Sequence, residues 1–151
     1  MFRKILVPTD GSPLSDTAGR AAVTLARGCG AEIVALSIAQ MLPLSAVSAD
    51  DPAGPAAAER GRALDLAAQR AGRIADMAGA AGVQHSVVTS AASPEHEEII
   101  RVAEESNCDL IFMATHGQGG LTRLIAGRVP QLVLAYSPLP VMLYRGSVMP
   151  A

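Results

Sequence analysis

The chain has 151 residues, of which half are hydrophobic, 3% are aromatic and none is tryptophan. This length and composition predict one compact domain with a core of Ala, Val, Ile, Leu and Met, and they exclude disorder over most of the chain. The formal net charge of −2 and the scatter of the arginines exclude a protein that chiefly grips nucleic acid by its phosphates.

No apolar run reaches the roughly 20 residues of a membrane span. Pro8–Gly11 interrupts the start of the chain before the apolar region of a secretory signal can form. Cys29 and Cys108 lack the spacing of metal ligands, so we interpret them as small buried residues. We expect the protein to reside in a reducing compartment. We therefore expect a cytoplasmic protein without a membrane partner.

The first part of the chain alternates strands and helices. Residues 4–8 predict a strand buried on both faces, and Ser12 and Pro13 predict the cap and first residue of a helix that ends at residues 28–30. The inward side chains of this helix are predicted to be Leu14, Ala18, Ala21, Ala22 and Leu25. A second strand is expected over residues 31–36.

Residues 41–55 are rich in Pro, Ser, Asp, Ala and Gly and have no periodicity, which predicts an exposed, mobile loop within the domain. A long Ala-rich helix is expected over residues 57–81, followed by a third strand over residues 85–89. The apolar face of that helix is predicted to hold Leu64, Ala68, Ala71, Ile74, Ala75 and Ala78.

The rest of the chain repeats the pattern. Ser93 and Pro94 predict another helix start, and three glutamates complement the positive end of its dipole. Its inward residues are predicted to be Ile99, Ile100 and Ala103. A fourth strand is expected over 109–113, a broken helical region ends near Tyr136, and a last strand covers 141–144. The domain is expected over 1–146, with 147–151 as a C-terminal tail. The alternation predicts an α/β fold: a three-layer α/β/α sandwich around an open parallel sheet.

Two predicted strand exits have unusual composition. Pro8, Thr9 and Asp10 lead into the first helix, and the Gly-rich stretch 114–120 follows the fourth strand, with Gly127 further on. Open parallel sheets bind ligands beyond the carboxyl ends of their strands, and glycines let backbone N–H groups approach an anion. Asp10 either faces such a ligand or braces its own turn. His116 fits a hydrogen-bonded loop residue better than a catalytic base, because no nucleophile accompanies it.

Two common nucleotide motifs are missing. Lys4 is the only lysine, so no glycine loop ends in Gly-Lys-Ser/Thr, and no G-x-G-x-x-G follows the first strand. However, residues 3–12, 108–117, 120–124 and 137–143 together resemble the universal stress protein family, and the resemblance covers nearly the whole chain. It implies a Rossmann-like, five-stranded parallel sheet in the order 3-2-1-4-5, with Asp10 beside the Gly117 loop.

The resemblance also implies a site for an adenine nucleotide, ATP with Mg²⁺ or Mn²⁺. ATP-binding members of the family look like G-x2-G-x9-G-[S/T] in the loop after the fourth strand. Their acid after the first strand lies near ribose and metal, which here is Asp10, and their backbone after the second strand meets adenine, which here is Ile38. The nucleotide-binding residues implied in this chain are Pro8, Thr9, Asp10, Ile38, Ala114, His116, Gly117, Gly127, Arg128 and Val129.

The match departs from the motif at two positions: Ala114 replaces the first glycine, and Arg128 replaces the Ser or Thr. Two interpretations therefore stay open. One is a stress-response regulatory module that binds ATP, with at most slow hydrolysis because no general base is positioned. The alternative is a nucleotide-independent dimeric interaction protein with a degenerate ATP loop. An enzyme that consumes ATP is a third reading. The resemblance further implies a homodimer through the edge strand 141–144; the sequence identifies no other protein partner.

Overall fold

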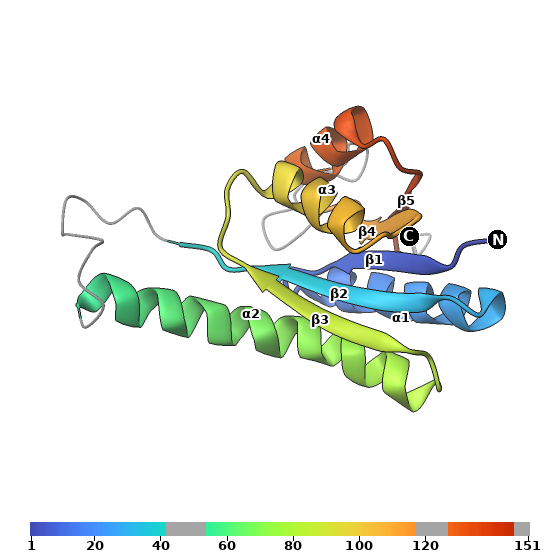
Figure 1. The fold of residues 1–151 in the computed structure, drawn as a ribbon, viewed down its shortest axis with the longest axis horizontal. Helices are drawn as coiled ribbons and strands as arrows, with labels where there is room; N and C mark the ends of the chain where they lie inside the picture. Colours follow the sequence, from blue (N-terminus) through green and yellow to red (C-terminus); the bar gives the residue numbers. More distant parts are fainter. Residues whose placement is uncertain (42–53, 117–126, 147–151) are drawn as a thin grey trace, which may run out of the picture.

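The computed structural model describes residues 1–41, 54–116 and 127–146. Within them, five parallel strands form one sheet in the order β3-β2-β1-β4-β5, as Figure 1 shows. The strands are β1 (Lys4–Pro8), β2 (Glu32–Ile38), β3 (His85–Ser90), β4 (Leu110–Ala114) and β5 (Val141–Tyr144). The predicted α/β fold and its strand order are therefore confirmed. The predicted loop 41–55 and tail 147–151 lie largely or wholly outside the described residues.

Helices cover both faces of the sheet. The helices α1 (Pro13–Cys29) and α2 (Pro55–Ala80) lie on one side in Figure 1, and α3 (Glu95–Glu105) and α4 (Arg128–Tyr136) lie on the other. The core accordingly has two parts, and alternate residues of β1 contribute to each. Ile5 and Val7 pack with α1 and α2, whereas Leu6 packs with α3 and α4. The burial of β1 on both faces is what its continuous apolar sequence predicted.

The start of α1 follows its sequence signal. Ser12 caps the helix by accepting a hydrogen bond from the Ser15 N–H at 3.2 Å, Pro13 begins it, and Gly30 ends it in a left-handed conformation. The start of α3 does not follow the same signal. Pro94 occupies the cap position and Glu95 is the first helical residue, so Ser93 lies one residue outside the cap. The prediction that Ser93 caps this helix is wrong.

The inward faces of the helices differ from the predicted stripes by one position in places. In α2, Ala67 is buried and Ala68 is exposed, although Ala71, Ile74, Ala75 and Ala78 are buried as expected. In α3, Val102 is buried whereas Ile100 is half-buried. In α1, the predicted Leu14, Ala21 and Leu25 are only partly buried, and the fully buried residues are Ser15, Ala18, Gly19, Ala22, Val23 and Ala26. A run of alanines carries little information about which side of a helix faces the sheet. A small rotation of the helix about its axis therefore cannot be predicted from the sequence.

Cys108 is buried and Cys29 is half-buried, and both are free thiols. Among the helices described, none is long and apolar enough to span a membrane.

Candidate nucleotide-binding pocket

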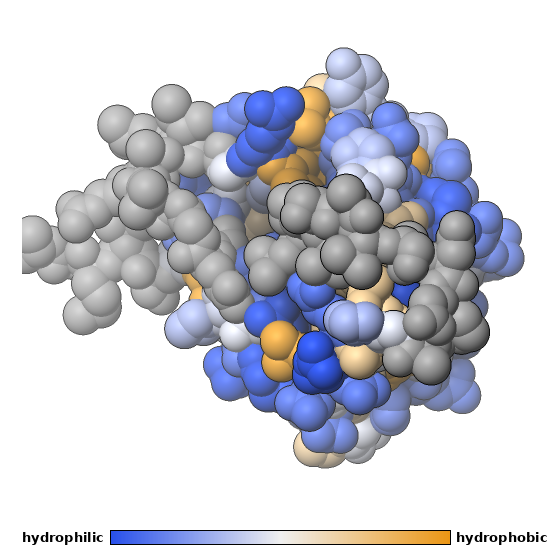
Figure 2. Space-filling view, turned by 90° about the vertical axis from the view of Figure 1, so that its left-hand side faces the viewer, coloured by the Kyte–Doolittle hydropathy of each residue, from blue (hydrophilic) through white to orange (hydrophobic). Residues whose placement is uncertain are grey.

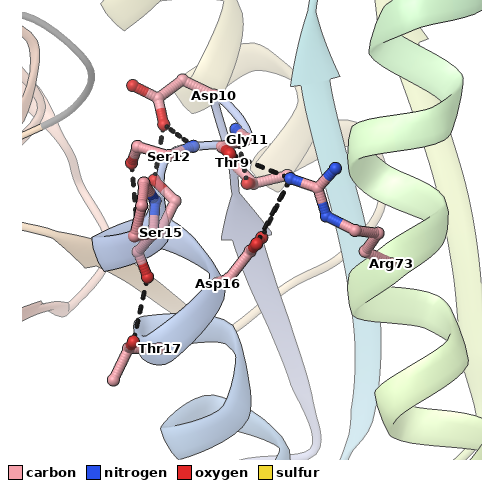
Figure 3. A network of polar contacts seen from close by, with 9 residues as sticks. Thr9, Asp10, Gly11, Ser12, Ser15, Asp16, Thr17 and Arg73 are labelled. Carbon is pink, nitrogen blue, oxygen red and sulfur yellow. Dashed lines mark hydrogen bonds and ion pairs between the residues drawn. The ribbon is translucent and has the colours of Figure 1, made fainter.

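The loop between β1 and α1 is held together by Asp10 (Figure 3). One oxygen of the Asp10 carboxylate accepts hydrogen bonds from the Ser12 N–H at 2.9 Å and from the Ser15 hydroxyl at 2.8 Å. The backbone N–H of Thr9 donates to the carbonyl of Leu36 at 2.8 Å, which ties the loop to β2. Asp10 therefore does brace its turn, and this contact also fixes where its carboxylate stands.

A second tie to this loop comes from α2. The Arg73 guanidinium donates to the Gly11 carbonyl at 2.9 Å and pairs with Asp16 at 3.2 Å, as Figure 3 shows. Gly11 has a φ of +79°, and a Cβ there would lie 2.8 Å from the side chain of Arg70. Only glycine fits this turn, because a side chain would be strained and would displace Arg70. The backbone after β1 is thus held from three sides.

The exit of β4 lies next to that of β1. Thr115 donates its N–H to the Tyr144 carbonyl at 3.0 Å, and its hydroxyl lies 3.2 Å from Nδ1 of His116. The carbonyl of Thr115 accepts the N–H of Gly127, the residue that precedes α4. Helix geometry leaves the first N–H groups of α4, at Arg128 and Val129, without partners inside the helix. The positive end of α4 is therefore directed to the space above β4.

A pocket of about 410 Å³ opens over these strand exits, a volume ordinary for a small-molecule site. Figure 2 looks onto this end of the molecule, where apolar surface is set among hydrophilic residues. Except for Gly117, which lies outside the described residues, every predicted site residue lines it: Pro8, Thr9, Asp10, Ile38, Ala114, His116, Gly127, Arg128 and Val129.

Sequence reasoning missed the remaining lining residues, which are Ser15, Leu36, Gln40, Glu95, Ile99, Met113 and Pro130. Leu36 and Met113 were predicted only as strand residues and Ile99 only as an inward residue of its helix, yet these core residues also line the pocket. Glu95 was interpreted as a charge complementing the dipole of α3. Nothing in the local sequence around Glu95 indicates that it also lines a pocket.

The pocket has polar side chains at both ends and Asp10 between them, and its floor is apolar. At the β4 side stand Arg128 and the amino end of α4, and at the β2 side stand Gln40 and the half-buried Glu95. Partial burial and the nearby Asp10 carboxylate raise the pKa of Glu95, while a hydrogen bond from the Gln40 side chain opposes that rise. A ligand in this pocket meets a cation at one end and carboxylates at the middle and the other end.

A metal site built from protein side chains alone does not form in the described part of the chain. No three His, Cys, Asp or Glu side chains converge there. Asp10 can supply one oxygen ligand, so a divalent cation would need most of its ligands from a bound molecule and from water.

Residues 1–145 match the model of the Universal stress protein family. The chain is 28% identical over 145 residues to universal stress protein MJ0531 of Methanocaldococcus jannaschii, covering 96% of this chain and 83% of that protein.

Two solved structures share the fold. The protein MJ0577 superposes with a TM-score of 0.83 at 23% identity, covering 99% of both chains. A universal stress protein solved in complex with cAMP has a TM-score of 0.66 at 21% identity, covering 97% of this chain and 98% of that one. With a family match over almost its full length and this fold, the chain belongs to the universal stress protein family.

Proposed function

We propose that this protein is a stress-response regulatory module that binds an adenine nucleotide, ATP with a divalent cation, in the pocket over β1 and β4. The observation that carries the proposal is the polarised pocket, which offers apolar side chains such as Ile38 and Ile99 for a base and, at its opposite end, Arg128 and the amino end of α4 for phosphates. The relative solved with cAMP supports a nucleotide as the class of ligand.

The residues fit such a ligand in different roles. The exposed Arg128 can pair with phosphate oxygens in place of the hydroxyl that the family motif has at this position. Asp10, held by Ser12 and Ser15, presents a preorganised carboxylate to ribose hydroxyls or to a cation that the phosphates hold. The bound cation would offset the repulsion between the triphosphate and the carboxylates of the pocket. We infer a binding role rather than rapid turnover, because the hydroxyl that lies beside His116 among the described residues is that of the buried Thr115.

The test is a calorimetric titration of nucleotide-stripped protein with ATP and Mg²⁺. We expect a dissociation constant in the micromolar range for the wild type and at least tenfold weaker binding for Arg128→Ser, which loses a charge-assisted contact. Arg20→Ser, which removes an exposed arginine of α1 away from the pocket, is the matched control and should bind like the wild type.

The alternative function, a nucleotide-independent interaction protein, rests on Ala114 and Arg128. It predicts the opposite effect of Arg128→Ser on ATP binding. If Arg128 blocks the phosphate end, the wild type shows no heat of binding and Arg128→Ser restores it. That result would reject the nucleotide-binding proposal for the native chain.

A further inference from the structure

Glu95 is an unexpected residue in a pocket for an anionic ligand. It is the first residue of α3, it is half-buried, and it lines the pocket together with Asp10 from the β1 exit and Gln40 from the β2 end. Glu98, one turn further along α3, accepts a hydrogen bond from the Ser90 hydroxyl at 2.7 Å, and the Ser90 carbonyl accepts the N–H of Ala39, the residue after β2. These contacts hold the start of α3, and with it Glu95, beside the end of β2.

The order of the strands indicates which part of a nucleotide Glu95 faces. The exits of β2, β1 and β4 follow one another along the sheet, so the lining runs from Gln40 past Asp10 to Arg128. Phosphates are drawn to the end with Arg128 and the amino terminus of α4. The base must then occupy the other end, over Ile38 and Ile99, where Glu95 also lies.

A carboxylate accepts hydrogen bonds and donates none when ionised. The groups of an adenine nucleotide that can donate to it are the ribose hydroxyls and the 6-amino group of the base. Asp10 stands at the middle exit, at the level of the sugar, whereas the ties of α3 to the ends of β3 and β2 place Glu95 at the β2 end. The 6-amino group is thus the donor that matches the position and chemistry of Glu95.

Resting on the proposed function, we propose that Glu95 is a specificity-determining residue that accepts a hydrogen bond from the 6-amino group of adenine. This contact selects bases that carry an amine over bases that carry a hydrogen or an oxygen there. A carboxylate facing a carbonyl oxygen at that position would be left unpaired and repelled.

The test compares ATP with purine riboside triphosphate, which has hydrogen in place of the 6-amino group and is otherwise the same molecule. Calorimetry with Mg²⁺ on the wild type should show ATP binding about tenfold or more tightly, the effect of one hydrogen bond to a charged group. In Glu95→Ala the two affinities should become nearly equal. In Glu95→Gln, whose amide oxygen is a neutral acceptor, a smaller preference should remain.

The control is Glu97→Ala, which removes an exposed carboxylate from the same helical turn outside the pocket lining and should keep the wild-type preference. If Glu95→Ala instead strengthens both nucleotides by the same factor, Glu95 acts only as a negative charge near the phosphates and the inference is wrong. If the wild type binds both nucleotides with equal affinity, the inference fails while the proposed function stands. If it binds neither, both fail.

Discussion

Glu98 shows how a single buried charge ties two elements of the fold. The residue is 4% exposed, and its carboxylate accepts hydrogen bonds from the Ser90 hydroxyl at 2.7 Å and from Nε of Arg101 at 2.8 Å. The contact with Ser90 joins the end of β3 to α3, the helix that carries Glu95 to the pocket. Hydrogen bonding by Arg101, helped by Ser90, lowers the pKa of Glu98 against the opposing effect of burial.

We predict that Glu98→Gln lowers the free energy of unfolding by about 1–2 kcal/mol at pH 7, because charge-assisted bonds are lost. A lowered pKa in the folded state stabilises the protein above the ordinary value of 4.5, and this contribution disappears as the pH falls through the lowered value. Urea unfolding at pH 7 and pH 3 should therefore show the difference from wild type narrowing in acid. The exposed Glu104→Gln should show little difference at either pH; a difference for Glu98→Gln that is independent of pH would contradict this account.

At the residue scale, the sequence predicted many of the residues that line the pocket. The composition at the strand exits pointed to Asp10, because the ends of parallel strands meet at one edge of a sheet, whereas Arg128 came from the family resemblance. Gln40 and Glu95 were missed because their approach depends on where a helix crosses the sheet. No local pattern in a single sequence records that crossing.

At the element scale, α1 and α2 pack closely because a glycine lies between them. A Cβ on Gly19 would stand 2.1 Å from Cδ1 of the fully buried Ile74. We predict that Gly19→Ala destabilises the protein by about 1–3 kcal/mol through overpacking, despite the better helix propensity of alanine. Gly72→Ala is the matched control in α2, because nothing lies within 4 Å of the added Cβ. It should stabilise the protein by roughly 0.5–1 kcal/mol. Thermal or urea unfolding measures both, and equal shifts of the same sign would refute the argument.

The elements themselves were largely predictable. In four of the five strands described, both the first and the last residue lie within one residue of the expected bounds. Short apolar runs between turn signals leave little freedom in where a strand can begin or end. The second strand continues to Ile38, two residues past its expected end, where Ser37 pairs with Thr89 and Ile38 with Ser90 of β3. Sequence periodicity could not anticipate this extension, because it depends on a neighbouring strand.

At the scale of the whole molecule, β5 is an edge strand that pairs on one side with β4. We propose that a second copy of the chain covers this edge and forms a homodimer, since an apolar open edge favours pairing. Light scattering at micromolar concentration should give a dimer for the wild type and a monomer for Met142→Lys, which charges an exposed side chain of β5. Val87→Lys charges an equally exposed position on the opposite edge strand, β3, and should remain dimeric. A monomeric wild type would end the proposal.

The position of the pocket has a consequence for how this chain can change over evolutionary time. Its floor, formed by residues such as Leu36 and Met113, is part of the core, whereas its rim residues Glu95 and Arg128 are half-buried and exposed. A substitution on the floor affects folding, but a substitution on the rim leaves both parts of the core intact. Ligand specificity and affinity can therefore change or be lost during evolution while the protein still folds as stably as its ancestor.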